Sequence, residues 1–134
     1  PVAAPVDLRA DVLARLARGE SLAGLDLSSA DLSKLDLYRA DLSGAILQRA
    51  DLSGARLEEA RLDGAMLLGA TLSSASLRGA SLVRADLTGV RAEGADLAGA
   101  LLAGAVLSEG AFAGAVFEGA QGLIFVGRNH DRME

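Results

Sequence analysis

Ala50-Asp51-Leu52-Ser53-Gly54 is one unit of a five-residue pattern that runs through most of this 134-residue chain. The pattern centres on Leu22 and on every fifth residue as far as Phe117. Ala stands two residues before most centres, and Gly two residues after most of them. No insertion breaks this frame between residues 20 and 119, so the repeat decides the fold.

A period of five fits neither a straight helix nor a straight strand. Successive centres on a helix would step by roughly 140° and decorate every side. On a strand they would alternate between the two faces, because five is odd. The pattern therefore predicts a corner in every pentad, with the centre and the residue two before it pointing inward. Gly or a small polar residue after the centre suits a turn with positive φ.

These Ala-Asp-Leu-x-x units resemble the pentapeptide-repeat proteins, and the resemblance covers residues 20–119. It implies an all-β fold, a right-handed quadrilateral β-helix with four pentads per coil. We expect about five coils and a rod roughly 24 Å long, at about 4.8 Å per coil. The expected interior consists of Leu ladders with smaller Ala between them, and includes Leu52, Leu67, Leu72, Leu87, Phe112 and Phe117.

The two ends leave the five-residue register. We expect a flexible lead-in over 1–6, a capping helix over 7–19, the β-helix over 20–120, and a closing segment with a loose tail over 121–134. Asp7 is the predicted N-cap, and Gly19 is the predicted stop. The predicted apolar stripe of this helix contains Leu8, Val12, Leu13 and Leu16. A cap is expected because an open solenoid end exposes Leu and unpaired backbone.

The repeat stops at Gly122, which stands where a Leu is due. The apolar run from Leu123 to Val126 follows it. Three roles stay open for this run: it closes the last coil, pairs with another chain, or continues into a longer protein.

Composition excludes several classes of protein. Hydrophobic residues make up 51% of the chain but aromatic residues only 3%, and the net charge is −5. With 23% charged residues, we expect neither a membrane span nor disorder, and the acidic balance disfavours direct nucleic-acid binding. The chain has no Cys, so no disulfide or thiolate site is expected. We expect a cytoplasmic location, with export by a dedicated system left open.

We expect no enzyme, and no catalytic, cofactor-binding or metal-binding residue. Catalysis needs convergent groups that support one another. The single His, His130, lies in the predicted tail, and the Ser residues fall at turn positions. The glycines follow the five-residue frame rather than a phosphate-binding loop.

Acidic residues surround the first predicted coil at Asp26, Asp31, Asp36 and Asp41. We interpret them as acceptors for backbone N–H groups at the corners. The alternative follows from the resemblance, because some pentapeptide-repeat proteins mimic B-form DNA and bind gyrase, which links them to quinolone resistance. Steps of twenty residues, however, interleave the charges, as in the row Asp36, Arg56, Ser76, Asp96, Val116. A phosphate mimic needs one continuous sign, so we rank this DNA-mimicking, gyrase-binding function second.

The first-ranked function is a non-catalytic protein-interaction or scaffold module. Its partner is an unknown protein or a second copy that meets the C-terminal coil, whose outward positions are mostly apolar. The candidate interaction surface comprises Ile46, Met66, Leu68, Leu101, Val106, Val116 and Phe125.

A second resemblance concerns the segment from Ala14 to Leu27, Ala-Arg-Leu-Ala-Arg-Gly-Glu-Ser-Leu-Ala-Gly-Leu-Asp-Leu. It looks like the start of pentapeptide-repeat regions in bacterial type VI secretion-associated proteins. This resemblance implies an adaptor or effector-associated role without catalysis.

Overall fold

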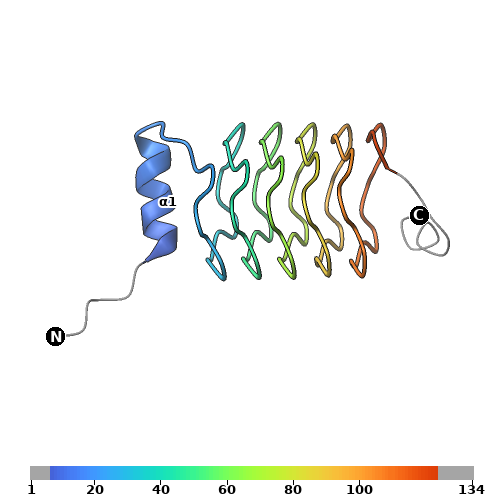
Figure 1. The fold of residues 1–134 in the computed structure, drawn as a ribbon, viewed down its shortest axis with the longest axis horizontal. Coiled ribbons are helices and arrows are strands. Elements are labelled where there is room, and N and C mark those ends of the chain that lie inside the picture. The colour runs from blue at the N-terminus through green and yellow to red at the C-terminus, as the bar shows by residue number, and fades with distance from the viewer. Residues whose placement is uncertain (1–6, 124–134) are drawn as a thin grey trace.

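A computed structural model describes residues 7–123, which form a rod of stacked coils with one helix across its N-terminal end (Figure 1). The predictions for residues 1–6, for Phe125 and for His130 in the tail lie outside the described residues.

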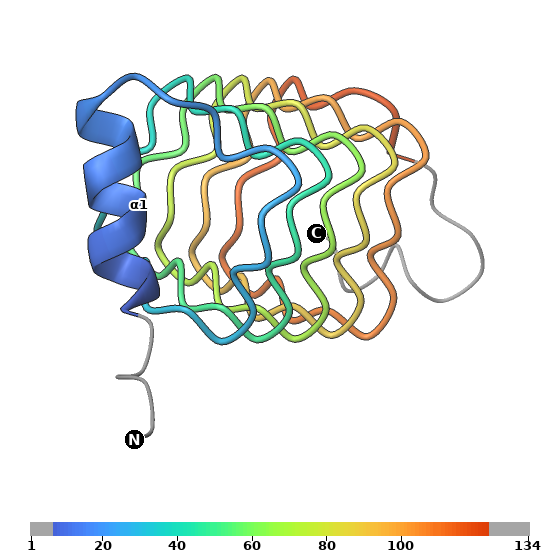
Figure 2. The same cartoon turned by 60° about the vertical axis from the view of Figure 1, so that its left-hand side comes forward.

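The coils stack through short parallel β-bridges. One such series joins Ile46 to Met66 and Met66 to Asp86, so the chain returns to the same face after four pentads. Figure 2 shows the consequence, a set of nearly square turns that lie one behind the next. The spacing agrees with the four pentads per coil that the family resemblance implied.

The pentad from Ala65 to Gly69 shows how each unit is held. The Leu67 N–H donates to the Asp86 carbonyl of the following coil at 2.7 Å, and the Met66 N–H donates to the Ala45 carbonyl of the preceding coil at 3.0 Å. The Ala70 N–H closes the corner on the Leu67 carbonyl at 2.9 Å. Each pentad therefore forms backbone hydrogen bonds to both neighbouring coils, and a further backbone hydrogen bond closes its own corner.

The corner requires a left-handed residue two positions after the inward Leu. Gly69 occupies this position with φ 65°, and Arg49 occupies the equivalent position with φ 57°. Gly adopts such an angle without strain, whereas a side chain makes it costly. The sequence predicts positive φ here, and the structure shows that it persists where the residue is a long charged one.

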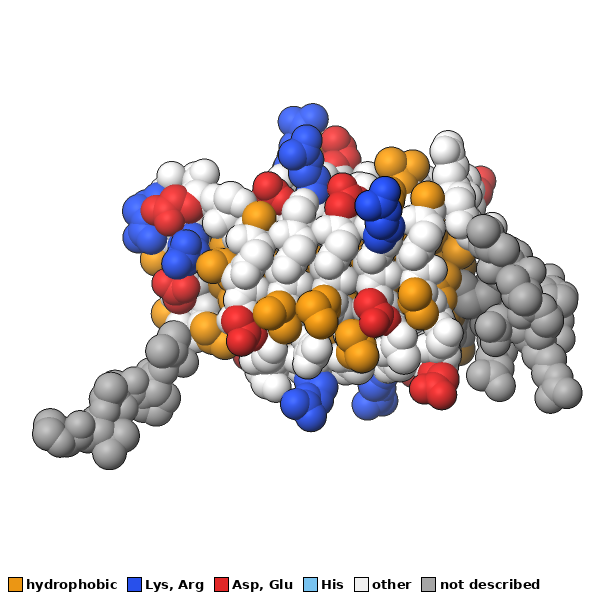
Figure 3. Space-filling view, in the orientation of Figure 1, with side chains coloured by type: hydrophobic (Ala, Val, Ile, Leu, Met, Phe, Trp, Pro, Cys, Tyr) orange, Lys and Arg blue, Asp and Glu red, His pale blue; other side chains and the backbone are white. Residues whose placement is uncertain are grey.

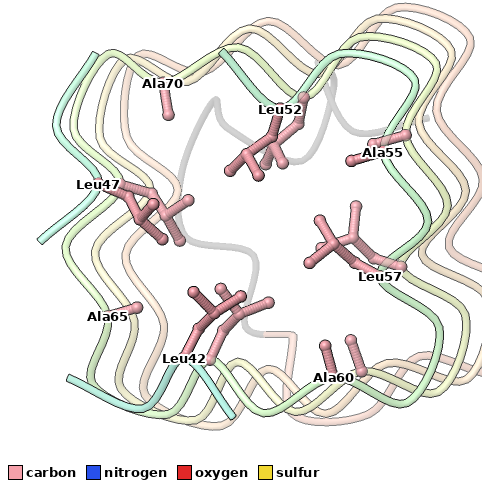
Figure 4. Packing of buried hydrophobic residues seen from close by; sticks show 14 of the residues in the cluster. Leu42, Leu47, Leu52, Ala55, Leu57, Ala60, Ala65 and Ala70 are labelled. Carbon is pink, nitrogen blue, oxygen red and sulfur yellow. The ribbon is translucent and has the colours of Figure 1, made fainter. Parts of the chain in front are cut away.

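Leu and Ala fill the interior, and their side chains point from all four sides toward the axis of the rod (Figure 4). Leu52, Leu67, Leu72 and Leu87 are at most 1% exposed, and Phe112 is 4% exposed. Phe117, expected in the interior, is only half-buried. It lies in the last coil, so no described coil covers its C-terminal side.

Helix α1 (Leu8–Ala17) lies across the first coil. The Asp7 carboxylate accepts from the Ala10 N–H at 3.0 Å and caps its N-terminus. At the C-terminus, the Gly19 N–H donates to the Leu16 carbonyl and the Glu20 N–H donates to the Arg15 carbonyl. These two bonds form a Schellman motif around left-handed Gly19.

One side of α1 seals the open end of the solenoid. Val12 is fully buried, and Leu8 and Leu16 are half-buried against the same core. Leu13, expected in this apolar stripe, is instead 46% exposed, because one residue turns a helix by roughly 100° and Val12 already points at the core. The Arg9 guanidinium donates to the Asp31 carbonyl at 3.0 Å and so links the helix to the first coil.

The last coil departs from the Ala-x-Leu interior at Gly110 and Phe112. A Cβ atom on Gly110 would overlap Cε2 of Phe112 and would lie 2.9 Å from its Cζ. The ring therefore fills the space that Ala occupies in other pentads. Phe112 and Phe117 also contact each other, with ring centroids 5.6 Å apart at an interplanar angle of 57°.

The chain leaves the last coil through Gly122. This residue has φ 86°, and a Cβ on it would lie 2.7 Å from Cα of Ala103. Only Gly permits this close backbone approach. Leu123 then packs against the core as a partly buried residue.

Candidate interaction surface

The residue before each inward Leu points outward, and the β-bridges arrange these residues in four rows along the rod. We name the four sides by these rows. Face 1 carries Asp26, Ile46, Met66, Asp86 and Val106; face 2 carries Asp31, Asp51, Thr71, Arg91 and Ala111. Face 3 carries Asp36, Arg56, Ser76, Asp96 and Val116; face 4 carries Asp41, Arg61, Ser81, Leu101 and Gln121.

Outward aspartates cap the turn that follows them. The Asp26 carboxylate accepts from the Ser28 N–H at 3.1 Å and from the Ser28 hydroxyl at 2.7 Å. Asp31 and Ser33 repeat the arrangement with the same distances, and Asp36 accepts from the Tyr38 N–H at 3.1 Å. The interpretation of these acids as acceptors for corner N–H groups is confirmed, so their first role is structural.

These hydrogen bonds stabilise the charged form of the carboxylates. The hydroxyl and then the backbone N–H of Ser28 lower the pKa of Asp26, and those of Ser33 do the same for the pKa of Asp31. For Asp96, burial acts to raise the pKa, but the Ala98 N–H and the Arg78 guanidinium outweigh it and the net direction is down.

The rod should lose stability in acid. A carboxylate whose folded pKa is depressed contributes stability that is present above the unfolded pKa, about 3.9 for Asp, and is lost as the pH falls through the folded pKa. We therefore expect the urea midpoint to stay level from neutral pH down to about pH 5 and to fall below about pH 4. The double variant Asp26→Asn, Asp31→Asn should fall less steeply, because each Asn keeps an acceptor oxygen but does not titrate. Equal slopes for the two proteins would contradict this assignment.

Opposite charges pair between neighbouring coils on face 3. Arg56 lies 3.8 Å from Asp36 one coil away, and Arg78 lies 2.9 Å from Asp96. Beside this row, Arg39 meets Glu59 at 3.3 Å. These pairs are exposed, so each contributes only about 0–1 kcal/mol. Their main consequence is that face 3 carries no continuous acidic ladder.

Four of the predicted interaction residues are well exposed. Met66 is 39%, Leu101 41%, Val106 44% and Val116 42% exposed. Ile46 and Leu68 are half-buried, and Phe125 lies outside the described residues. The predicted interaction residues between 7 and 123 lie in two places. Leu101, Val106 and Val116 lie on the outside of the C-terminal coil (residues 101–120), where Val106 is the last residue of the face 1 row. Ile46, Met66 and Leu68 lie together on face 1, nearer the N-terminus.

The C-terminal coil also ends in an open backbone edge within the described part of the chain. In the coil before it, the Leu87, Ala92 and Leu97 N–H groups each donate to the following coil at 2.7 Å. The equivalent N–H groups of Leu107, Phe112 and Phe117 have no hydrogen-bond partner among residues 7–123. Such an edge is a template for further pairing.

Tyr38 is an exposed aromatic residue outside the predicted interaction surface. It is 48% exposed, its hydroxyl donates to Glu59 of the next coil at 3.4 Å, and the Arg39 guanidinium lies 5.6 Å from its ring centroid. The twenty-residue step that aligns the charge rows would also have brought Tyr38 beside Glu58 and Glu59.

Residues 7–123 contain neither a metal-binding cluster nor a membrane-spanning helix. No group of three or more His, Cys, Asp or Glu side chains in this range could hold a metal ion. Within the same range, α1 is the one helix, and it is neither long nor apolar enough to cross a bilayer.

Comparison with known proteins identifies the repeat. The family model described as pentapeptide repeats matches in eight copies, over residues 21–49, 45–82, 55–94 and 80–119. No curated protein matches this sequence significantly.

Solved structures give the same result. A pentapeptide repeat protein from the cyanobacterium Cyanothece is 27% identical over 84% of this chain and 97% of its own, with a TM-score of 0.53. One from the thylakoid lumen of Arabidopsis thaliana is 34% identical over 87% of this chain and 74% of its own, with a TM-score of 0.49. A trypsin-treated form of QnrB1, a plasmid-mediated fluoroquinolone resistance protein, is 24% identical over 71% of this chain and 59% of its own, with a TM-score of 0.32. The repeat and the Cyanothece structure imply a right-handed β-helix.

Proposed function

We propose that this chain, which belongs to the pentapeptide-repeat family, works as a non-catalytic protein-interaction module whose C-terminal coil is its main contact surface. The observation that carries the proposal is the composition of that coil. It combines the exposed side chains of Leu101, Val106 and Val116 with a half-buried Phe117 at its end.

Two physical arguments support this surface. When a partner buries the apolar side chains on the outside of this coil, binding is stabilised by about 25 cal/mol for each Å² of apolar surface removed from water. The donors of Leu107, Phe112 and Phe117, which lack partners among the described residues, add directional groups for pairing. At the other end, α1 already covers the first coil. The two ends of the rod therefore differ in what they offer to a partner.

Self-association through the C-terminal coil is tested by sedimentation velocity over a range of protein concentrations. We expect the wild-type chain to sediment as a concentration-dependent dimer and the double variant Val106→Glu, Val116→Glu to sediment as a monomer. Each substitution places a charge in the apolar contact, where it would have to lose its water.

The matched control is Thr71→Glu, Ser76→Glu, which adds the same two charges to the middle of the rod and should leave the dimer intact. Identical monomer profiles for all three proteins would reject self-association and leave a different protein as the partner of this coil.

The DNA-mimicking function is the weaker candidate. A mimic of the phosphate backbone needs continuous negative charge, but face 2 contains Arg91, face 3 contains Arg56 and face 4 contains Arg61. On face 1, apolar Ile46 and Met66 separate the two acids. We therefore expect no inhibition of DNA supercoiling by gyrase at stoichiometric concentrations of this protein, and no protection of gyrase from a quinolone. Dose-dependent inhibition would reverse this ranking.

The adaptor role in type VI secretion rests on the resemblance of the Ala14–Leu27 segment, and it stays a prediction together with the cytoplasmic location. Secretion genes beside the gene for this chain would support the adaptor role, and their absence would count against it.

A further inference from the structure

Face 1 differs from the other three faces because its outward rows contain no basic residue. Its bridge row, and the adjacent outward row Ser28, Gln48, Leu68, Thr88 and Ser108, contain no Lys or Arg. Each of the other faces has an Arg in its bridge row. Face 1 therefore carries the negative charges of Asp26 and Asp86 with no basic residue in its own two rows, and the flanking basic residues, Arg49 and Arg84, stand at the corners on its two sides.

The two acids of face 1 also form no salt bridge with any residue between 7 and 123. Asp26 and Asp86 each accept from their own turn, with the hydroxyls of Ser28 and Thr88 at 2.7 and 2.6 Å. Three aspartates on faces 2 and 3 in addition have a nearby Arg: they are Asp31 with Arg9, Asp36 with Arg56, and Asp96 with Arg78. Asp26 and Asp86 therefore have no Lys or Arg partner among residues 7–123.

Between these acids lies an apolar patch on neighbouring coils. Met66 is 39% exposed, and it pairs through a β-bridge with half-buried Ile46. Leu68, two residues after Met66, lies beside them. Figure 3 shows one side of the rod on which hydrophobic side chains form a row between acidic ones.

The charge selects the kind of partner. A second copy that met this face with its own face 1 would bring four carboxylates together, and the outward rows of the two faces would contribute no cation between them, which is unfavourable. A partner that supplies Lys or Arg over each acid and apolar side chains between them matches both the charge and the patch.

The spacing favours a helix over a strand in that partner. Successive coils are about 4.8 Å apart along the rod, and successive turns of an α-helix are about 5.4 Å apart. Alternate residues of an extended strand are about 6.8 Å apart, so they lose their alignment with successive coils over a shorter length than helical turns do. Asp26 and Asp86 are three coils apart, roughly 14 Å, which corresponds to cations three helical turns apart, about 11 residues, on the same face of a helix.

We propose that face 1 binds a basic amphipathic helix of a partner protein, which lies along the rod with its apolar side chains on Ile46, Met66 and Leu68 and its cations at Asp26 and Asp86. This inference rests on the proposed interaction function but assigns it a second surface, distinct from the C-terminal coil.

The test selects binders without assuming a partner. A displayed library of a small helical scaffold, with one helix face randomised, is selected on the immobilised full chain. Selected binders are sequenced, and their affinities are measured at low and high salt. The target proteins are the wild type, Met66→Glu, Met66→Thr, Val116→Glu and the double variant Asp26→Asn, Asp86→Asn. Thermal denaturation checks that each variant is folded. If Met66→Glu does not fold, Met66→Thr replaces it in the comparison, because Thr71 occupies the equivalent position of the next pentad.

We expect enriched binders to carry apolar residues at three- and four-residue spacing and two cations about 11 residues apart on the same helix face. Met66→Glu should weaken them about tenfold or more. The Asp26→Asn, Asp86→Asn variant should remove most of their salt dependence, and Val116→Glu should have no effect.

Three outcomes would overturn the proposal: no enriched binder, enriched binders without basic residues, or binding that is insensitive to both Met66 variants. Binders lost with Val116→Glu but retained with Met66→Glu would reject face 1 and leave the C-terminal coil as the interaction surface.

Discussion

Leu67→Lys is expected to abolish cooperative folding. Leu67 is fully buried in the middle of the rod, and its backbone N–H bonds to the next coil at 2.7 Å. Its side chain lies in a ladder of Leu and Ala that offers no partner to an ammonium group, because no polar or charged residue among those described is buried. The cost of burying the charge, at least about 5 kcal/mol, equals or exceeds the total stability of many domains of this size.

Met66→Lys provides the matched control one residue away. Met66 is 39% exposed on face 1, so the same ammonium group remains in water there. We expect Met66→Lys to change the free energy of unfolding by less than about 1 kcal/mol. Urea denaturation followed by circular dichroism checks both variants. A cooperative transition for Leu67→Lys close to that of wild type would show that the inward register is wrong.

Gly110→Ala is expected to destabilise the C-terminal coil although it introduces the residue that most pentads carry at this position. The added Cβ would overlap Cε2 of the Phe112 ring. The ring would have to move, and it also packs against Phe117, whose centroid is 5.6 Å away. Overpacking of this kind costs about 1–3 kcal/mol, and the urea midpoint should fall accordingly.

Phe112→Leu should rescue that loss. In the double variant Gly110→Ala, Phe112→Leu the pentad recovers the usual Ala-x-Leu interior, so its stability should exceed the sum of the two single effects by about 1 kcal/mol or more. Additive effects in this double-mutant cycle would mean that the ring does not occupy the space above Gly110.

The repeat made much of the surface predictable as well as the core. A step of twenty residues places Asp36 beside Arg56, and the structure brings these residues into a β-bridge and a salt bridge. The role of Asp26 and its equivalents as turn caps was also predictable, because an Asp two residues before a backbone N–H is a common local acceptor. Both results follow from regular geometry that repeats with the sequence.

The terminal elements were less predictable. The helical period predicts an apolar stripe that includes both Val12 and Leu13, but only Val12 meets the core. Which of two adjacent side chains packs inward depends on how α1 lies across the first coil, and this orientation is a property of the docked helix. Likewise, Phe117 occupies an inward position of the repeat, yet it is half-buried because its neighbours on one side end with the last coil.

The sequence by itself determined the inside of this protein. A Leu every fifth residue, with Ala two positions earlier, suffices to place both on the interior, because each pentad repeats the same local turn and the same ladder. The tertiary structure alone decided the outside and the ends. The tertiary structure determines which side chains of neighbouring coils touch and how much of Val116 and Phe117 is accessible to solvent. It also explains why a Cβ on Gly110 would collide with Phe112. Those properties depend on what lies one coil away, and at the ends of a solenoid the neighbour on one side is no longer another repeat.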